Sequence, residues 1–117
     1  MRLELPFPPT ANTMFPSNKT GRRFLSARGK AYRDEVYRRV LEAHGIFKPF
    51  TEPVSVLVEL YPPDNRKRDI DNSFKALFDS LTYSSVWMDD DQVKELHARM
   101  LPKVKGGKCI IVITGMD

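Results

Sequence analysis

The sequence predicts a single small α+β domain over residues 1–117, with helices packed on a small mixed sheet. Three observations predict this class. A chain of 117 residues suits one domain. Residues 54–61 alternate apolar and polar side chains as a strand does, and apolar residues recur at helical spacing in two other segments. The expected order is β-α-β-α-β-β, with no internal repeat and no linker.

The chain begins with an expected strand over Arg2–Phe7, where Leu3 and Leu5 alternate before a run of prolines. Residues 8–24 are rich in Pro, Thr, Asn and Gly, which predicts a long loop. The loop carries basic side chains beside an aromatic one, namely Lys19, Arg22, Arg23 and Phe24. This combination suits contact with DNA, although a solvated loop explains it equally well.

Ser26 is expected to cap a helix that runs to about Ala43 and ends at Gly45. Apolar residues fall on one face of this helix, namely Tyr32, Val36, Val40 and Ala43. The opposite surface is basic and carries Arg28, Arg33, Arg38 and Arg39. Such a surface is either simply solvated or part of a phosphate-binding region.

The C-terminal half continues with the alternating strand at 54–61, which Pro62 and Pro63 end, and with a helix expected over Asp69–Thr82. Its apolar stripe consists of Ile70, Phe74, Leu77, Phe78 and Leu81. Two further strands are expected. The first includes the alternating residues Leu96, Ala98 and Met100, with Val93 out of phase, which predicts a turn or bulge between them; the second covers Cys109–Thr114.

The last strand is apolar on both faces, which predicts a central position in the sheet or a place at an interface. Gly106 and Gly107 are expected to form a hairpin turn before it.

Composition limits the function classes. No stretch approaches the ~20 apolar residues of a membrane-spanning helix. The N-terminal residues lack the apolar core of a secretory signal, so we expect a cytoplasmic protein. A single cysteine, Cys109, excludes an internal disulfide and a cysteine-based zinc site.

The net charge is +4, from 19 basic and 15 acidic residues. Five acids lie in two clusters, Asp69/Asp71 and Asp89–Asp91, so 19 bases face only 10 acids elsewhere. A basic body with concentrated carboxylates suits a protein that binds a polyanion and carries a metal ion, although charge alone favours an ordinary soluble protein.

The segment RDIDNSFKALFD, residues 68–79, is the most informative. At 100° per residue, Asp71 and Lys75 lie one helical turn apart on the flank of the apolar stripe, where we expect them to be partly shielded. Asp69 lies at the helix start, where carboxylates are electrostatically favoured. Asp79 lies about 12 Å further along the axis than Asp71 and is therefore left out of the expected metal site.

The second acidic segment is WMDDDQV, residues 87–93. In an extended segment only alternate side chains face one way, so either Asp90 faces the site or Asp89 and Asp91 do. Spacing alone does not decide between them.

These residue types suit hydrolysis of a phosphodiester. Mg²⁺ prefers oxygen ligands and needs only two or three carboxylates beside a substrate phosphate. The ion polarises the phosphoryl oxygen and activates a bound water, and a neighbouring lysine stabilises developing negative charge. Each feature also has a structural explanation, because Asp71–Lys75 and Lys75–Asp79 have the spacing of ordinary helix-surface ion pairs and Asp69 has the position of an N-cap.

The segments RDIDN, Lys75, FD at 78–79 and WMDDDQV resemble the signature of the RusA family of Holliday junction resolvases. LPFPPTAN near the start, AYRD at 31–34 and the tail MLPKVKGGKCIIVIT are also similar to this family. The resemblance implies a homodimeric, Mg²⁺-dependent endonuclease, with Mn²⁺ as a substitute. It further implies binding of four-way DNA junctions and paired symmetric nicks in DNA recombination and repair.

Carried over by position, the resemblance implies that Asp69, Asp71 and Asp90 bind the metal, that Lys75 is the catalytic lysine and that Arg68 contacts DNA. The sequence departs from the family's pattern at Asn65, which interrupts the basic run before RDIDN, and at Asp91, an extra acid; the first loop is loosely matched as well. Two alternatives stay open: a nuclease for other branched or single-stranded DNA, and a non-catalytic DNA-binding protein whose carboxylates are structural.

Overall fold

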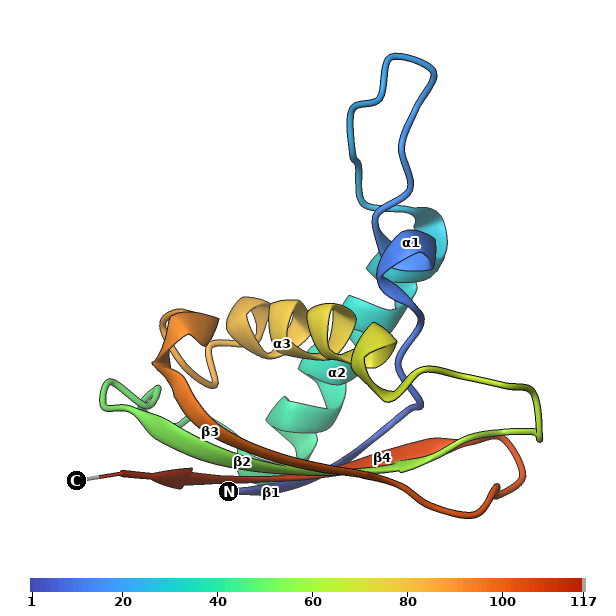
Figure 1. The fold of residues 1–117 in the computed structure, drawn as a ribbon. Coiled ribbons are helices and arrows are strands. Elements are labelled where there is room, and N and C mark those ends of the chain that lie inside the picture. Colours follow the sequence, from blue (N-terminus) through green and yellow to red (C-terminus); the bar gives the residue numbers. More distant parts are fainter. Residues whose placement is uncertain (117) are drawn as a thin grey trace.

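A four-stranded mixed sheet organises the fold in the computed structural model, which describes residues 1–116 (Figure 1). The strands are β1 (Arg2–Leu5), β2 (Val54–Tyr61), β3 (Val93–Met100) and β4 (Lys108–Gly115). Their order in the sheet is β1-β4-β2-β3, with β2 and β3 parallel and the other two pairs antiparallel. The predicted α+β class and mixed sheet are therefore confirmed.

Strand β4 lies in the interior of the sheet, as its apolar sequence predicts, because it pairs with both β1 and β2. The predicted hairpin at Gly106 and Gly107 is wrong, since β3 pairs with β2 and not with β4. The two glycines do form a turn, with φ of 80° and 70°. The end of β3 and the start of β4 lie at the same end of the sheet, but β2 lies between the two strands, so the connection crosses the end of β2.

The predicted irregularity at the start of β3 is confirmed. Val54 pairs with Val93, whereas Ser55 pairs with Glu95, so Lys94 is an extra residue in the ladder. This bulge puts Leu96, Ala98 and Met100 on one face of the strand. β3 thus starts at Val93, earlier than its alternating residues alone indicate.

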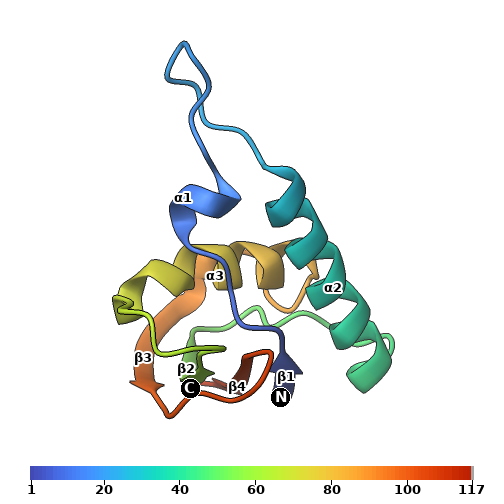
Figure 2. The same ribbon diagram turned by 90° about the vertical axis from the view of Figure 1, so that its right-hand side faces the viewer.

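Helices α2 (Ala27–His44) and α3 (Phe74–Tyr83) lie on the same face of the sheet (Figures 1 and 2). The predicted boundaries of α2 are confirmed: the Ser26 hydroxyl accepts a hydrogen bond from the Gly29 amide at 2.9 Å, and Gly45 follows the helix with φ of 62°. Helix α3 connects the parallel strands β2 and β3. No helix within residues 1–116 has the length and apolar character needed to cross a bilayer.

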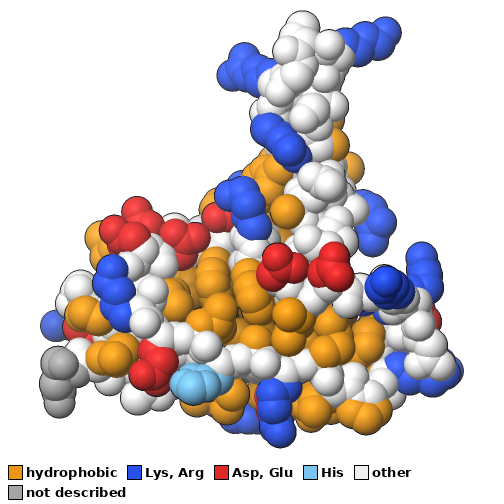
Figure 3. Space-filling view, viewed as in Figure 1, with side chains coloured by type: hydrophobic (Ala, Val, Ile, Leu, Met, Phe, Trp, Pro, Cys, Tyr) orange, Lys and Arg blue, Asp and Glu red, His pale blue; other side chains and the backbone are white. Residues whose placement is uncertain are grey.

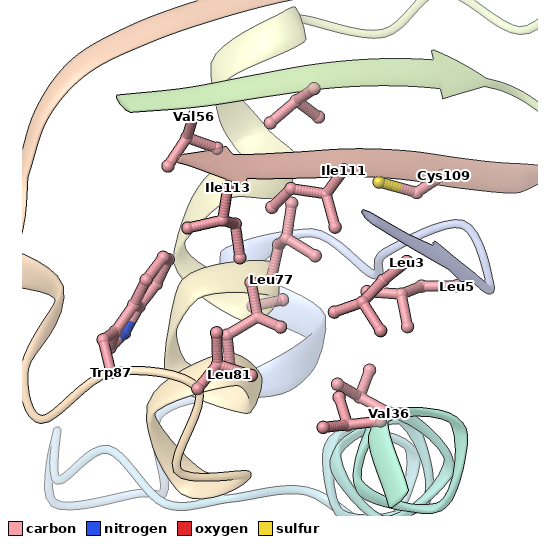
Figure 4. Close-up of a cluster of buried hydrophobic side chains, with 14 of the residues drawn as sticks. Leu3, Leu5, Val36, Val56, Leu77, Leu81, Trp87, Cys109, Ile111 and Ile113 are labelled. Carbon is pink, nitrogen blue, oxygen red and sulfur yellow. The ribbon is translucent and has the colours of Figure 1, made fainter. Parts of the chain in front are cut away.

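The core lies between the sheet and these two helices (Figure 4). Trp87 is 1 % exposed, and its indole N–H donates to the Thr82 hydroxyl at 2.7 Å. Its ring packs edge-on against the Phe78 ring, with 5.7 Å between the ring centres. Ala43, expected on the buried face of α2, is exposed instead because it lies in the last turn, beyond the edge of the core. Other buried side chains of the core come from β1, β2, β4 and both helices, among them Leu3, Val36, Val56, Leu77, Leu81, Ile111 and Ile113. β3 contributes only partly buried residues, Val93, Ala98 and Met100.

The predicted loop over residues 8–24 is only partly a loop. It contains a short helix, α1 (Ala11–Met14), whose N-cap Thr10 accepts a hydrogen bond from the Thr13 amide. Residues 15–24, called the arm below, then project from the body, and an isolated bridge joins Ser17 to Arg23 across them (Figures 1 and 2).

Candidate active site

The first acidic segment does not start as an α-helix, so the predicted start at Asp69 is wrong. Ile70–Ser73 form a 3-10 turn, η1, and α3 begins only at Phe74. Asp69 is in an extended conformation before the turn and makes no side-chain capping bond. Asp71 and Lys75, which we expected to be partly shielded, are both exposed, and so is Asp69.

Lys75 lies in the first turn of α3 and pairs with Asp79 rather than with Asp71. Its ammonium lies 3.2 Å from the Asp79 carboxylate and 5.1 Å from the centre of the Phe15 ring. Within residues 1–116 Asp69 and Asp71 have no ion-pair partner within 4.0 Å. The two carboxylates thus keep their negative charge available to an external cation.

The second acidic segment is a turn and not the extended strand that we expected. Asp90–Gln92 form a 3-10 turn, η2, and Asp89 and Gln92 cap it reciprocally. The Asp89 carboxylate accepts from the Asp91 amide at 3.0 Å, so Asp89 has a structural role. The strand alternation that left Asp90 and Asp91 undecided does not apply to such a turn.

The Gln92 side chain fixes η2 to neighbouring segments of the backbone. Its amide oxygen accepts from the backbone N–H groups of Met88 and Asp89 at 2.9 and 3.0 Å. Its amide nitrogen donates to the carbonyls of Phe50 and Glu52 at 2.9 and 3.0 Å. One side chain therefore satisfies four backbone groups and attaches the acidic turn to the segment before β2.

Asp90 faces α3 from this turn. Partial desolvation, the charge of Asp79 and the neighbouring Asp89 raise the pKa of Asp90, while the Lys75 ammonium opposes them. Lys75, Asp79 and Asp90 therefore share one electrostatic environment. Asp79 is left out of the metal site expected from the sequence because of its distance from Asp71. The signal for its place beside Lys75 was the spacing of four residues between them, which puts the two side chains on one helix face.

The acidic residues do not converge on a single point. Among the acidic side chains on this face, Figure 3 shows one group over the start of α3 and a separate group over the segment that leads into β3. Within residues 1–116, no three carboxylate, imidazole or thiol side chains lie close enough to bind one metal ion. The structure thus brings Asp69 and Asp71 to one end of α3, and Asp90 towards Lys75 and Asp79.

Arg68, expected to contact DNA, is partly buried and organises the loop before η1. Its guanidinium lies 2.8 Å from the Asp64 carboxylate, donates to the carbonyls of Asp64 and Arg66 at 3.2 Å, and lies 5.4 Å from the centre of the Phe7 ring. Hydrogen bonds from Arg68 and from the Arg66 amide hold the pKa of Asp64 well below its ordinary value. Arg68 therefore fixes the path of the chain into Asp69.

The basic residues of the arm divide into two kinds. Arg23 donates to the carbonyl of Phe15 at 2.7 Å and to the Asn12 side chain at 3.3 Å, so it braces the base of the arm. Lys19 and Arg22 are exposed, and neither side chain has an ion pair within the described chain. Figure 3 shows basic side chains on the projecting arm, well separated from one another.

The family model described as "Endodeoxyribonuclease RusA" matches residues 6–114. The chain belongs to this family. Several RusA relatives are 40 % identical over 114 residues, which is 97 % of this chain and 93 % of each relative. They include the crossover junction endodeoxyribonucleases of Enterobacteria phage 82, Shigella sonnei and Escherichia coli K12. The resemblance noted in the sequence is thereby confirmed.

The RusA match covers both acidic segments and everything between them. In this RusA chain the two segments are the short turns η1 and η2, which flank the exposed surface of α3 that carries Lys75 and Asp79. The site is therefore an open surface and not an enclosed cavity, which suits a large polyanionic substrate.

Proposed function

We propose that this chain is a structure-selective endodeoxyribonuclease that cleaves four-way DNA junctions. The observation that carries the proposal is the family match over residues 6–114, together with the position of its two acidic segments around one exposed lysine. The relatives are named crossover junction endodeoxyribonucleases. The excess of basic residues outside the acidic clusters favours binding of DNA through its phosphates.

We propose Asp69, Asp71 and Asp90 as the carboxylates that hold Mg²⁺, with Mn²⁺ as a substitute; η1 and η2 would have to approach each other for Asp90 to share an ion with the other two. Asp69 and Asp71 fit a hard cation, because both are exposed oxygen donors without an ion pair among residues 1–116. Mg²⁺ is typically bound by one or two carboxylates, several waters and a substrate phosphate, so a crowded set of acids is not required. The bound ion would polarise the phosphoryl oxygen and lower the pKa of a bound water.

Lys75 is proposed as the catalytic lysine. Its ammonium lies on the exposed surface of α3 between the two acidic turns, so it is within the region where a scissile phosphate would meet both. A positive charge there stabilises the negative charge that develops on the phosphate and on the leaving oxygen. Lys19, Arg22 and Arg23 of the arm, with Arg68, are proposed as residues that orient the DNA.

A homodimer is part of the proposal. A four-way junction has approximate two-fold symmetry, and an isologous C2 dimer presents one active site to each of two equivalent strands. Paired symmetric nicks follow from that arrangement, in a role in DNA recombination and repair. The molar mass of the protein in solution, measured by light scattering, tests this part separately: twice the chain mass of 13.5 kDa supports it, and a monomer with and without junction DNA contradicts it.

The decisive experiment uses a labelled synthetic four-way junction and a linear duplex of the same sequence, each with Mg²⁺ and with EDTA. Paired nicks that appear only in the junction, and only with Mg²⁺, are the expected result. Cleavage of both substrates at equal rates would make the protein a less selective nuclease. Binding of the junction without cleavage in Mg²⁺ or Mn²⁺ would favour a non-catalytic DNA-binding protein.

A further inference from the structure

A groove of about 980 Å³ lies beside η1, on the side of the site away from η2. One wall is the chain from Pro6 to Thr10, and the loop that carries Arg66, Lys67 and Arg68 also lines the groove. The N-terminal half of α2 forms a further part of the lining. Asp69 and Ser73 also line the groove, so it opens directly onto the first acidic turn.

The groove is preformed by packing. The buried Tyr32 hydroxyl donates to the Pro6 carbonyl at 3.0 Å, which fixes the proline wall to α2. Desolvation by burial raises the pKa of Tyr32 well above its ordinary value, so the hydroxyl stays a donor. At the far end, a Cβ atom on Gly107 would lie 2.9 Å from the Phe7 Cβ, so the turn before β4 approaches this wall as closely as a glycine allows. The two prolines after Phe7, Pro8 and Pro9, have little backbone freedom and keep the wall extended.

The charge that faces the groove is positive and only partly neutralised. Arg66 and Arg68 are both paired with Asp64. The single glutamate of the lining, Glu35, is itself paired with Arg38 and Arg39 on the next turns of α2.

Two other cations of the lining, Arg28 and Lys67, have no ion-pair or hydrogen-bond partner within residues 1–116. They come from α2 and from the loop before η1, so they approach the groove from two different elements. Two unpaired cations beside a preformed groove favour an anionic ligand that extends along it.

We propose that this groove holds the sugar–phosphate backbone of the strand that leads to the scissile phosphate, with Arg28 and Lys67 as its phosphate contacts. The proposal rests on the proposed nuclease function and adds the path of the substrate strand to it. A strand in the groove ends beside Asp69, which places its next phosphate at the first acidic turn. Neither cation supports the fold through a partner in the described chain, so both can be replaced without loss of an ion pair.

The first test measures the affinity for a synthetic four-way junction at a series of NaCl concentrations. The protein carries Asp71→Asn, so that no cleavage occurs. Each phosphate contact that is lost lowers the slope of log K against log [salt] by about 0.9. Arg28→Gln and Lys67→Gln are expected to lower it by about one unit each, and the double variant by about two.

The matched controls are Lys30→Gln, two residues along the same helix, and Lys48→Gln. Both lysines are exposed, lie outside the groove lining and have no ion pair in the described chain. Both controls are expected to leave the slope unchanged. The proposal would be overturned if the groove variants had the same slope as the Asp71→Asn parent, or if the controls lowered the slope as much as the groove variants do. Thermal melting confirms that each variant is folded.

The second test finds where the strand lies. Methylphosphonate linkages, which carry no charge, replace single phosphates in turn along the strand around the crossover. A linkage that weakens binding by the Asp71→Asn protein, and not by the same protein with Arg28→Gln added, identifies the phosphate that Arg28 contacts. The expected position is on the cleaved strand next to the nick; the same response in both proteins at every linkage, or a position on the uncleaved strand, would contradict the proposed path.

The two proposals fail separately. If the groove variants lower the salt dependence of junction binding but the wild-type protein cleaves no junction in any metal, the groove binds DNA and the nuclease function is wrong. If junction cleavage is intact and the groove variants match the controls, the nuclease function stands and the strand runs elsewhere.

Discussion

Replacing Asp79 by asparagine isolates the ion pair that holds Lys75. At the observed 3.2 Å, two unit charges attract by about 1.3 kcal/mol in a water-like medium and by about 5 kcal/mol at an effective dielectric constant of 20. The Lys75 side chain is 61 % exposed and Asp79 is 31 % exposed, so the lower figure applies, and measured exposed pairs give about 0.2–1 kcal/mol. If this attraction keeps the Lys75 ammonium at the site, losing about 1 kcal/mol of it in Asp79→Asn corresponds to a roughly fivefold slower cleavage step.

The assay is single-turnover cleavage of a four-way junction with enzyme in excess, in parallel with junction affinity. Asp79→Asn is expected to slow cleavage about fivefold without weakening binding, since it removes a negative charge from a surface that meets phosphate. Lys75→Ala is expected to slow cleavage with little loss of affinity. In the Lys75→Ala background Asp79→Asn should have no further effect, because the pair no longer exists. An undiminished effect in that background, or faster cleavage by Asp79→Asn alone, would refute the reasoning.

Three further results are expected. Asp71→Asn abolishes cleavage but keeps or tightens junction binding, as measured by gel shift; full cutting by this variant would contradict the metal-site assignment. Hydrogen bonds from Arg38 and Arg39 lower the pKa of Glu35 to about 2, so its contribution to folding is complete above its ordinary pKa near 4.5 and declines as the pH falls towards 2. Glu35→Gln should therefore lower the melting temperature at pH 7, and the difference should vanish in acid. Burial raises the pKa of Cys109 to about 12, so a thiol reagent at pH 8 should label it only after denaturation.

Elements with complete local signals were predictable from the sequence. Helix α2 has a capping serine at one end, a glycine at the other and apolar residues at helical spacing, and the structure keeps those boundaries. Strand β2 alternates without interruption, and Val54, Val56, Val58 and Leu60 are all fully buried. In both cases local propensity and tertiary burial favour the same conformation.

Elements that depend on distant partners were not predictable. Two consecutive glycines indicate a turn but contain no information about which strands flank it, so the β3–β4 hairpin was wrong. The start of α3 was placed too early because a 3-10 turn and an α-helix share much of their sequence pattern over four residues. The environment of Asp79 required the position of η2, which comes from a later segment of the chain.

The contacts of Gln92 have a consequence for how the two acidic turns respond to a ligand. Two of its four hydrogen bonds go to the carbonyls of Phe50 and Glu52 and tie η2 to the segment before β2, so the Asp90 side of the site is anchored to the sheet. The opposite turn, η1, has no capping side chain, and a backbone hydrogen bond from Asn72 to Asp69 at 3.2 Å closes it. The site therefore combines one turn that is held firmly, η2, with one that is held by fewer contacts, η1. If the distance between the two turns shortens when DNA binds, we expect η1, with Asp69 and Asp71, to move.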